Sequence, residues 1–206
     1  MFLIPLAKSN SIISSIPPET VPIVILIVSI VALTIIIERS IYFGRFKSLH
    51  PDELRKVKDH LRSSEWDNAR DILERNSKGP ATTVLSSVID LKRRDYPHIE
   101  DEYRSEAYRQ IFQMEKFLTG LGTIATISPL LGVLGTVLGM IRAFAEGTGT
   151  KGAEVGISEA LITTAFGLGV AIPAYIFYNY LVKKKEEKIS EMENLSEQIL
   201  PILIEP

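Results

Sequence analysis

Cysteine is absent from this chain of 206 residues, and histidine is scarce, with three in all. The absence of cysteine excludes disulfide bonds and cysteine-ligated metal sites, although it says little about the cellular compartment. The three histidines, His50, His60 and His98, lie far apart, and their spacing is not that of a metal site. We therefore expect no catalytic residues, no metal and no cofactor, and we predict that the chain is not an enzyme.

An excess of charge of one sign is also lacking. The chain has 23 lysines and arginines against 25 acidic residues, a net charge of −2. Such a balance gives no indication of nucleic-acid binding. The segment EGTGTKGAEVG is rich in glycine like a phosphate loop, but it lacks the order Gly, four residues, Gly-Lys-Ser/Thr. We interpret it as a flexible connection.

Long uncharged runs are what the chain does have, at residues 21–37, 117–141 and 160–182. Each approaches or exceeds the roughly 18–20 residues that a helix needs to cross a bilayer. Glu38, Arg39 and Ser40 follow the first run instead of a small-residue cleavage site, so we expect this helix to be retained. The sequence predicts an all-α integral membrane protein with three transmembrane helices, of which the second and third extend into a cytoplasmic helical bundle.

Basic residues predict the orientation of the spans. Arg39, Arg45 and Lys47 follow the first run and lysines 183–185 follow the third, whereas Lys8 alone is basic before the first. Because basic residues concentrate on the cytoplasmic side, we expect the N-terminus outside and the C-terminus in the cytoplasm. The predicted segments are an outer N-terminal segment (1–20), span one (21–43), a cytoplasmic helical region (44–116), span two (117–145), an outer loop (146–156), span three (157–182) and a cytoplasmic C-terminal helix (183–206).

The helices outside the membrane follow from local patterns. Ser64 and Asp67 resemble a capping box at the start of a short helix. From His98 onward no breaker precedes span two, so we predict one helix that runs into the membrane. After span three, apolar residues recur every three or four positions and predict an amphipathic helix in the bundle. These residues are Ile189, Met192, Leu195, Ile199 and Leu203.

Small residues interrupt the second and third spans, although a glycine costs about 1 kcal/mol relative to alanine in a helix. Helices in lipid associate through close packing of small residues, which is one sufficient explanation. Pro129 adds an expected kink. The predicted packing residues are Ser128, Pro129, Gly132, Gly135 and Gly139 in span two and Ala160, Gly167 and Ala171 in span three.

Three polar residues suggest an ion pathway instead of packing alone. Thr136 and Thr164 place hydroxyls near the middle of apolar spans, and Glu159 stands at the outer start of span three. Acids at membrane depth are costly and mark ion or proton pathways. The alternative for Glu159 is an interfacial acid that stabilises a helix N-terminus.

The motifs SPLLGVLGTVLGMIRAF and ISEALITTAFGLGVAIPAYIFYNYL, with ERSIYF after span one, resemble the TolQ/ExbB/MotA proton-channel family. The three-span layout favours the ExbB/TolQ-like branch. The resemblance implies a bacterial inner-membrane homopentamer around a dimer of single-span ExbD/TolR-like partners, which carry a membrane aspartate. Ions passing between the two would drive work on the envelope, with a TonB/TolA-like protein as a further partner.

The resemblance also implies roles for single residues. Thr136 and Thr164 correspond to the channel threonines of spans two and three, and Glu159 to the third-span acid. Thr163 departs from the pattern, because it adds a hydroxyl where a small apolar residue is typical. An extra oxygen ligand would suit sodium instead of the proton. A non-conducting pentameric scaffold remains the alternative from another class, and the sequence names neither the partner nor the role of residues 50–95.

Overall fold

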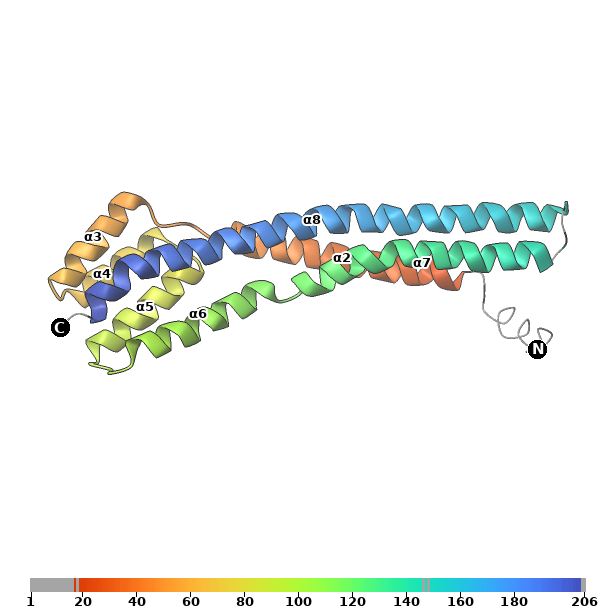
Figure 1. The fold of residues 1–206 in the computed structure, drawn as a ribbon. Helices are drawn as coiled ribbons and strands as arrows, with labels where there is room; N and C mark the ends of the chain where they lie inside the picture. Colours follow the sequence, from red (N-terminus) through yellow and green to blue (C-terminus); the bar gives the residue numbers. More distant parts are fainter. Residues whose placement is uncertain (1–16, 18, 146, 148, 205–206) are drawn as a thin grey trace, which may run out of the picture. The chain divides into compact units, whose positions relative to one another are not determined.

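The computed structural model describes residues 17, 19–145, 147 and 149–204. Most of the predicted outer N-terminal segment therefore lies outside the described residues, as do Glu146 and Thr148 of the predicted outer loop. The described residues form seven helices (Figure 1): α2 (Thr20–Gly44), α3 (Pro51–Arg62), α4 (Trp66–Asn76), α5 (Pro80–Arg93), α6 (Ile99–Glu115), α7 (Leu118–Ala145) and α8 (Lys151–Ile204).

Three stretches are long and apolar enough to cross a membrane, and they confirm the predicted fold class. They are Thr20–Gly44, Ile99–Ala145 and Lys151–Ile204, whose most apolar windows have mean hydropathies of 3.0, 2.0 and 1.8. Extended pairing in the described residues is limited to an isolated bridge between Lys47 and Lys78. The protein is an all-α membrane protein.

The chain divides into two compact units. The membrane unit contains the described residues within Met1–Ile37 together with Thr119–Asn179. The bundle unit contains Glu38–Leu118 and the described residues within Tyr180–Pro206. Each unit contains residues from distant parts of the sequence, because α2, α7 and α8 each begin in one unit and end in the other.

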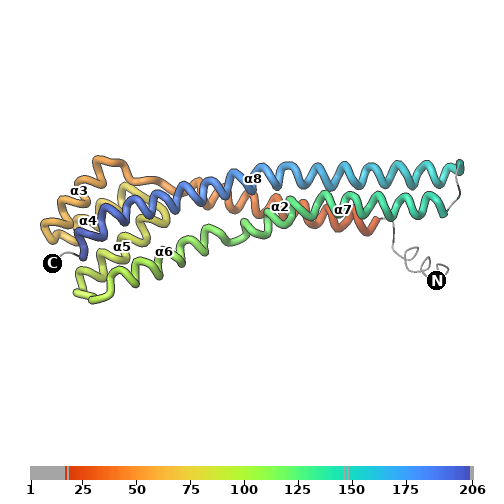
Figure 2. Tube along the Cα trace, viewed as in Figure 1, coloured from red at the N-terminus to blue at the C-terminus, as the bar shows by residue number. Residues whose placement is uncertain are grey.

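The bundle unit has one apolar core, to which α3, α4, α5, α6 and α8 all contribute. In Figure 2 the tubes of α3 to α6 gather around the last turns of α8. The predicted amphipathic face of α8 is confirmed, because Met192, Leu195, Ile199 and Leu203 are buried and Ile189 is half-buried. Tyr103 of α6 hydrogen-bonds Ser196 of α8, and burial raises the pKa of this phenol.

The predicted N-cap at Ser64 is wrong by one residue. α4 begins at Trp66 with Glu65 as its N-cap, and Ser64 adopts a left-handed φ of 58°. The Glu65 carboxylate accepts from Asn68 Nδ2 at 2.9 Å and lies 2.6 Å from His60 Nδ1. These two hydrogen bonds lower the pKa of Glu65. The Glu65 side chain makes no hydrogen bond to the backbone amides at the start of α4, so the expected capping box does not form.

The prediction of one unbroken helix into span two is also wrong. α6 ends at Glu115 and α7 begins at Leu118. Lys116 has φ −50° and ψ 131°, and Phe117 has φ 66°. These angles approach those of a type II turn, whose second central residue is normally glycine. A left-handed conformation costs a non-glycine residue about 1–2 kcal/mol, so tertiary contacts must hold this break.

Candidate functional site

Close contact between α7 and α8 is the main feature of the membrane unit. A methyl group placed on Gly167 would lie 2.6 Å from the Ser128 carbonyl oxygen, and one on Gly132 would lie 3.0 Å from Thr164 Cα. A methyl group on Gly139 would lie 2.7 Å from the Ala160 Cβ. The two backbones therefore approach to distances that side chains would prevent, as expected for helices that associate in lipid.

Thr164 forms a hydrogen bond across this contact. Its Oγ1 donates to the Gly132 carbonyl oxygen at 3.0 Å. Gly132 has no side chain to shield that carbonyl, so the hydroxyl of the neighbouring helix can reach it. The sequence singled out both residues, and the structure brings them together.

Glu159 and Thr163 meet at a second position, nearer the α7–α8 connection. Thr163 is 5% exposed and lies against Gly135, and its Oγ1 donates to the Glu159 carbonyl oxygen at 2.9 Å. The exposed Glu159 side chain and Thr163 line a recess of about 20 Å³ together with Arg142 of α7. This volume is about that of a single water molecule.

Arg142 was missed by the sequence analysis, although a signal was available. It is the first charged residue after the uncharged run of span two. Its position in the recess places a cation and the Glu159 carboxylate at the same end of the helix pair. The recess therefore combines the Glu159 carboxylate, the Arg142 guanidinium and the buried Thr163 hydroxyl at this end of the spans.

Thr136 lies apart from these groups. It is half-buried, and its Oγ1 donates to the Val133 carbonyl oxygen of its own helix at 2.7 Å. Threonine commonly satisfies its hydroxyl in this way. Thr136 does not belong to the described residues that line the recess.

The remaining predicted packing residues lie within the helix pair. Ser128 is fully buried, and its Oγ donates to the Ile124 carbonyl oxygen at 2.8 Å. Ala160 and Ala171 are buried on α8, and Pro129 lies inside α7. Among the described residues, no group of three or more histidines and acids could hold a metal ion.

A groove with hydroxyl groups lies at the other end of the helix pair and was also missed. It has a volume of about 460 Å³. Thr123 Oγ1 donates to the Thr119 carbonyl oxygen at 2.9 Å, and Thr126 Oγ1 to that of Gly122 at 3.0 Å. The three- to four-residue spacing of these threonines was visible in the sequence. The groove residues are Thr119, Gly122, Thr123, Thr126, Ile127, Tyr175 and Tyr178.

Comparisons with known proteins place this site in a family. The chain is 30% identical over 158 residues to the putative biopolymer transport protein ExbB-like 3 of Synechocystis sp., covering 73% of this chain and 75% of that protein. It is 42% identical over 97 residues to the biopolymer transport protein ExbB of Aquifex aeolicus, covering 43% of this chain and 66% of that protein. It is 38% identical over 100 residues to the Tol-Pal system protein TolQ of Haemophilus influenzae, covering 46% and 44%.

The family description "MotA/TolQ/ExbB proton channel family" matches residues 70–194, which is more than half of the chain. This match includes all of α7 and the part of α8 that packs against it. The glycine contacts, the threonine hydroxyls and the acid at the start of the third span all fall within it. The chain therefore belongs to the MotA/TolQ/ExbB proton channel family.

Proposed function

We propose that the chain is the ion-conducting subunit of an inner-membrane motor complex of the ExbB–ExbD or TolQ–TolR type. In this complex the ion-motive force would drive mechanical work on the outer membrane or envelope. The transported ion would be the proton. The observation that carries the proposal is the hydrogen bond from the Thr164 hydroxyl of α8 to the Gly132 carbonyl oxygen of α7.

The physical role of the threonines follows from the cost of polar groups in lipid. A charge or unpaired polar group at membrane depth is expensive, so an ion pathway needs fixed dipoles near the moving charge. The Thr164 hydroxyl donates a hydrogen bond to the Gly132 carbonyl oxygen and keeps its oxygen lone pairs available. The Thr136 hydroxyl donates a hydrogen bond to the Val133 carbonyl oxygen and would present a second such oxygen.

Glu159 would act at the outer mouth of the pathway. Its exposed side chain shares the recess with Arg142 and with the Thr163 hydroxyl. A carboxylate there would raise the local concentration of protons or other cations. This role requires the N-terminus to lie outside, which is the orientation that the distribution of basic residues predicts.

The partners are part of the same proposal. Five copies of the chain would enclose a dimer of single-span ExbD/TolR-like helices, whose membrane aspartate would exchange its proton near Thr136 and Thr164. A TonB/TolA-like protein would receive the work. Exposed apolar side chains on α7 and α8, such as Leu130, Leu134, Leu161 and Phe166, would contact lipid or these neighbouring helices.

Ion flux into liposomes tests the proposal. The chain is reconstituted alone and together with its single-span partner, and proton and sodium gradients are applied in separate experiments. We expect proton flux that requires the partner. Sodium flux that falls in Thr163→Ala would instead identify a sodium-driven member, because Thr163 adds a buried oxygen beside Glu159. An intact complex that conducts neither ion would identify a scaffold.

A further inference from the structure

Arg39 is a buried cation at the start of the bundle unit, in the ERSIYF motif after span one. Its side chain is 4% exposed, and its Nε lies 2.7 Å from Glu38 Oε2. The guanidinium carbon lies 4.8 Å from the centre of the Tyr42 ring and 5.2 Å from that of Phe117. A buried charge needs such partners, because its desolvation is otherwise costly.

One of these contacts reaches the backbone at the break between α6 and α7. Arg39 Nη1 donates to the Gln113 carbonyl oxygen at 2.9 Å. In an unbroken helix this carbonyl would accept the amide of Phe117, four residues later. Arg39 therefore occupies the acceptor that a continuous helix would use, and its guanidinium also contacts the ring of the residue with the left-handed φ.

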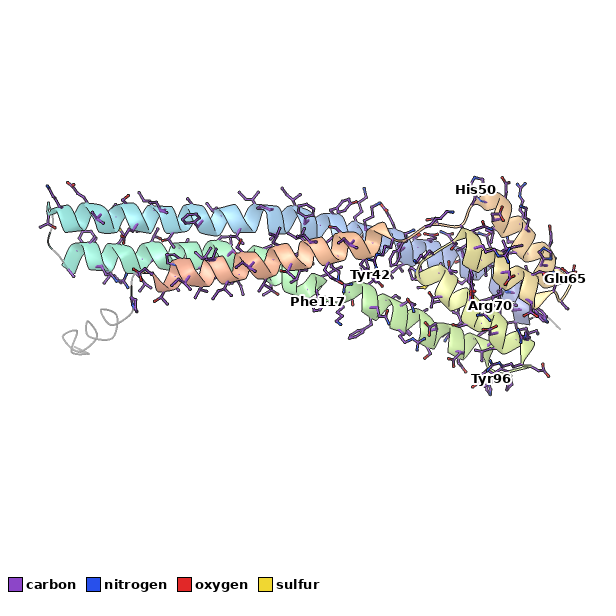
Figure 3. All side chains as sticks on the ribbon, turned by 180° about the vertical axis from the view of Figure 1, so that it is seen from behind. Tyr42, His50, Glu65, Arg70, Tyr96 and Phe117 are labelled. Atoms are coloured by element: carbon purple, nitrogen blue, oxygen red, sulfur yellow. The ribbon has the colours of Figure 1, made fainter. Side chains whose placement is uncertain are left out.

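The break has no sequence signal of its own. Lys116 and Phe117 are neither glycine nor proline, and the left-handed φ of 66° at Phe117 is unfavourable for an aromatic residue. Unfavourable backbone conformations persist where surrounding contacts fix them. Figure 3 labels Phe117 in the break between α6 and α7 and Tyr42 on α2, the two rings that contact Arg39.

We propose that Arg39 is a positioning residue that stabilises the non-helical backbone of Lys116 and Phe117 between α6 and α7. It does so through the Gln113 carbonyl and the Phe117 ring, and it thereby sets where the helix of span two begins. This inference does not depend on which ion, if any, the protein conducts.

Spin-label distance measurements test this role, and the absence of cysteine makes labelling specific. Cysteines replace the exposed residues Arg104 on α6 and Thr123 on α7. Labelled chains are diluted with unlabelled ones in the intact assembly, so that only distances within a chain contribute. An unbroken helix would separate these Cα atoms by about 29 Å, and the distribution of the unmodified chain is the reference for the broken form.

The variants separate a positioning role from general destabilisation. Arg39→Gln removes the charged donor, and we expect a shift of the distribution toward the unbroken-helix distance. The double variant Arg39→Gln with Phe117→Gly should restore the distribution of the unmodified chain, because glycine adopts a left-handed φ freely. Arg45→Gln, at an exposed arginine shortly after α2, is the matched control and should leave the distribution unchanged.

Two results would overturn the proposal. One is a distribution for Arg39→Gln that is identical to that of the unmodified chain. The other is failure of Phe117→Gly to restore the distribution of the unmodified chain in the Arg39→Gln background. The restoration step keeps the test decisive even if Arg39→Gln lowers the yield of folded protein.

Discussion

Gly167 and Gly169 are two residues apart on α8, yet their surroundings differ sharply. A methyl group on Gly167 would meet the Ser128 carbonyl oxygen and the Gly132 backbone, whereas one on Gly169 would meet no described atom within 4 Å. The sequence alone predicted that Gly167 packs closely, because small residues collect where membrane helices meet. It could not identify the atoms that each glycine meets, because these depend on the register between the two helices.

We predict that Gly167→Ala destabilises the contact between α7 and α8 by about 1–3 kcal/mol, because the added methyl group must push the two backbones apart. Gly169→Ala should be neutral or stabilising by up to about 1 kcal/mol, since alanine favours the helix. Unfolding of the single chain in mixed detergent micelles, titrated with sodium dodecyl sulfate, measures both. Equal effects of the two substitutions would show that Gly167 has no special packing role.

At the scale of elements, periodicity predicted the last part of α8 well and the end of α6 badly. The apolar repeat from Met192 to Leu203 indicated a buried face, and the residues of that repeat are buried. The break at Phe117 escaped prediction because it depends on Arg39, a residue 78 positions earlier in the chain. Local rules detect breaks that glycine or proline marks, and this one is held by a tertiary contact.

Ile199 tests the importance of the α8 face to the bundle unit. It is fully buried in the core, so Ile199→Ala should lower the free energy of unfolding of this unit by about 2–5 kcal/mol. The control is Ile204→Ala, because Ile204 is 44% exposed on the same helix. Hydrogen exchange of the α5 amides, which belong to the same core, should speed up in the first variant and stay unchanged in the second. Unchanged α5 exchange in Ile199→Ala would mean that α8 does not stabilise the bundle.

At the scale of the whole molecule, hydropathy and charge were enough to predict an all-α protein with three spans. The division into two units was not predicted, because each unit joins segments that lie far apart in the sequence. The candidate site was predicted in part. Thr164, Glu159 and Thr163 were predicted from the sequence. Arg142 and the threonine groove were missed despite their sequence signals, because the packing of α7 against α8 decides which residues share a recess or groove.

The central claim is that the Thr164 hydroxyl belongs to an ion pathway. Thr164→Val keeps the shape of the side chain and removes the hydroxyl, whereas Thr164→Ser keeps the hydroxyl and removes a methyl group. A hydrogen bond between the Thr164 hydroxyl and the moving charge would contribute about 1.4 kcal/mol, which corresponds to about tenfold in the rate of ion flux.

Proton flux should be measured for both variants in liposomes that hold the chain and its single-span partner, after each complex is shown to be intact. We predict that Thr164→Val lowers the flux about tenfold and that Thr164→Ser retains most of it. An assembled Thr164→Val complex that conducts as fast as the unmodified one would contradict the assignment of Thr164 to the pathway.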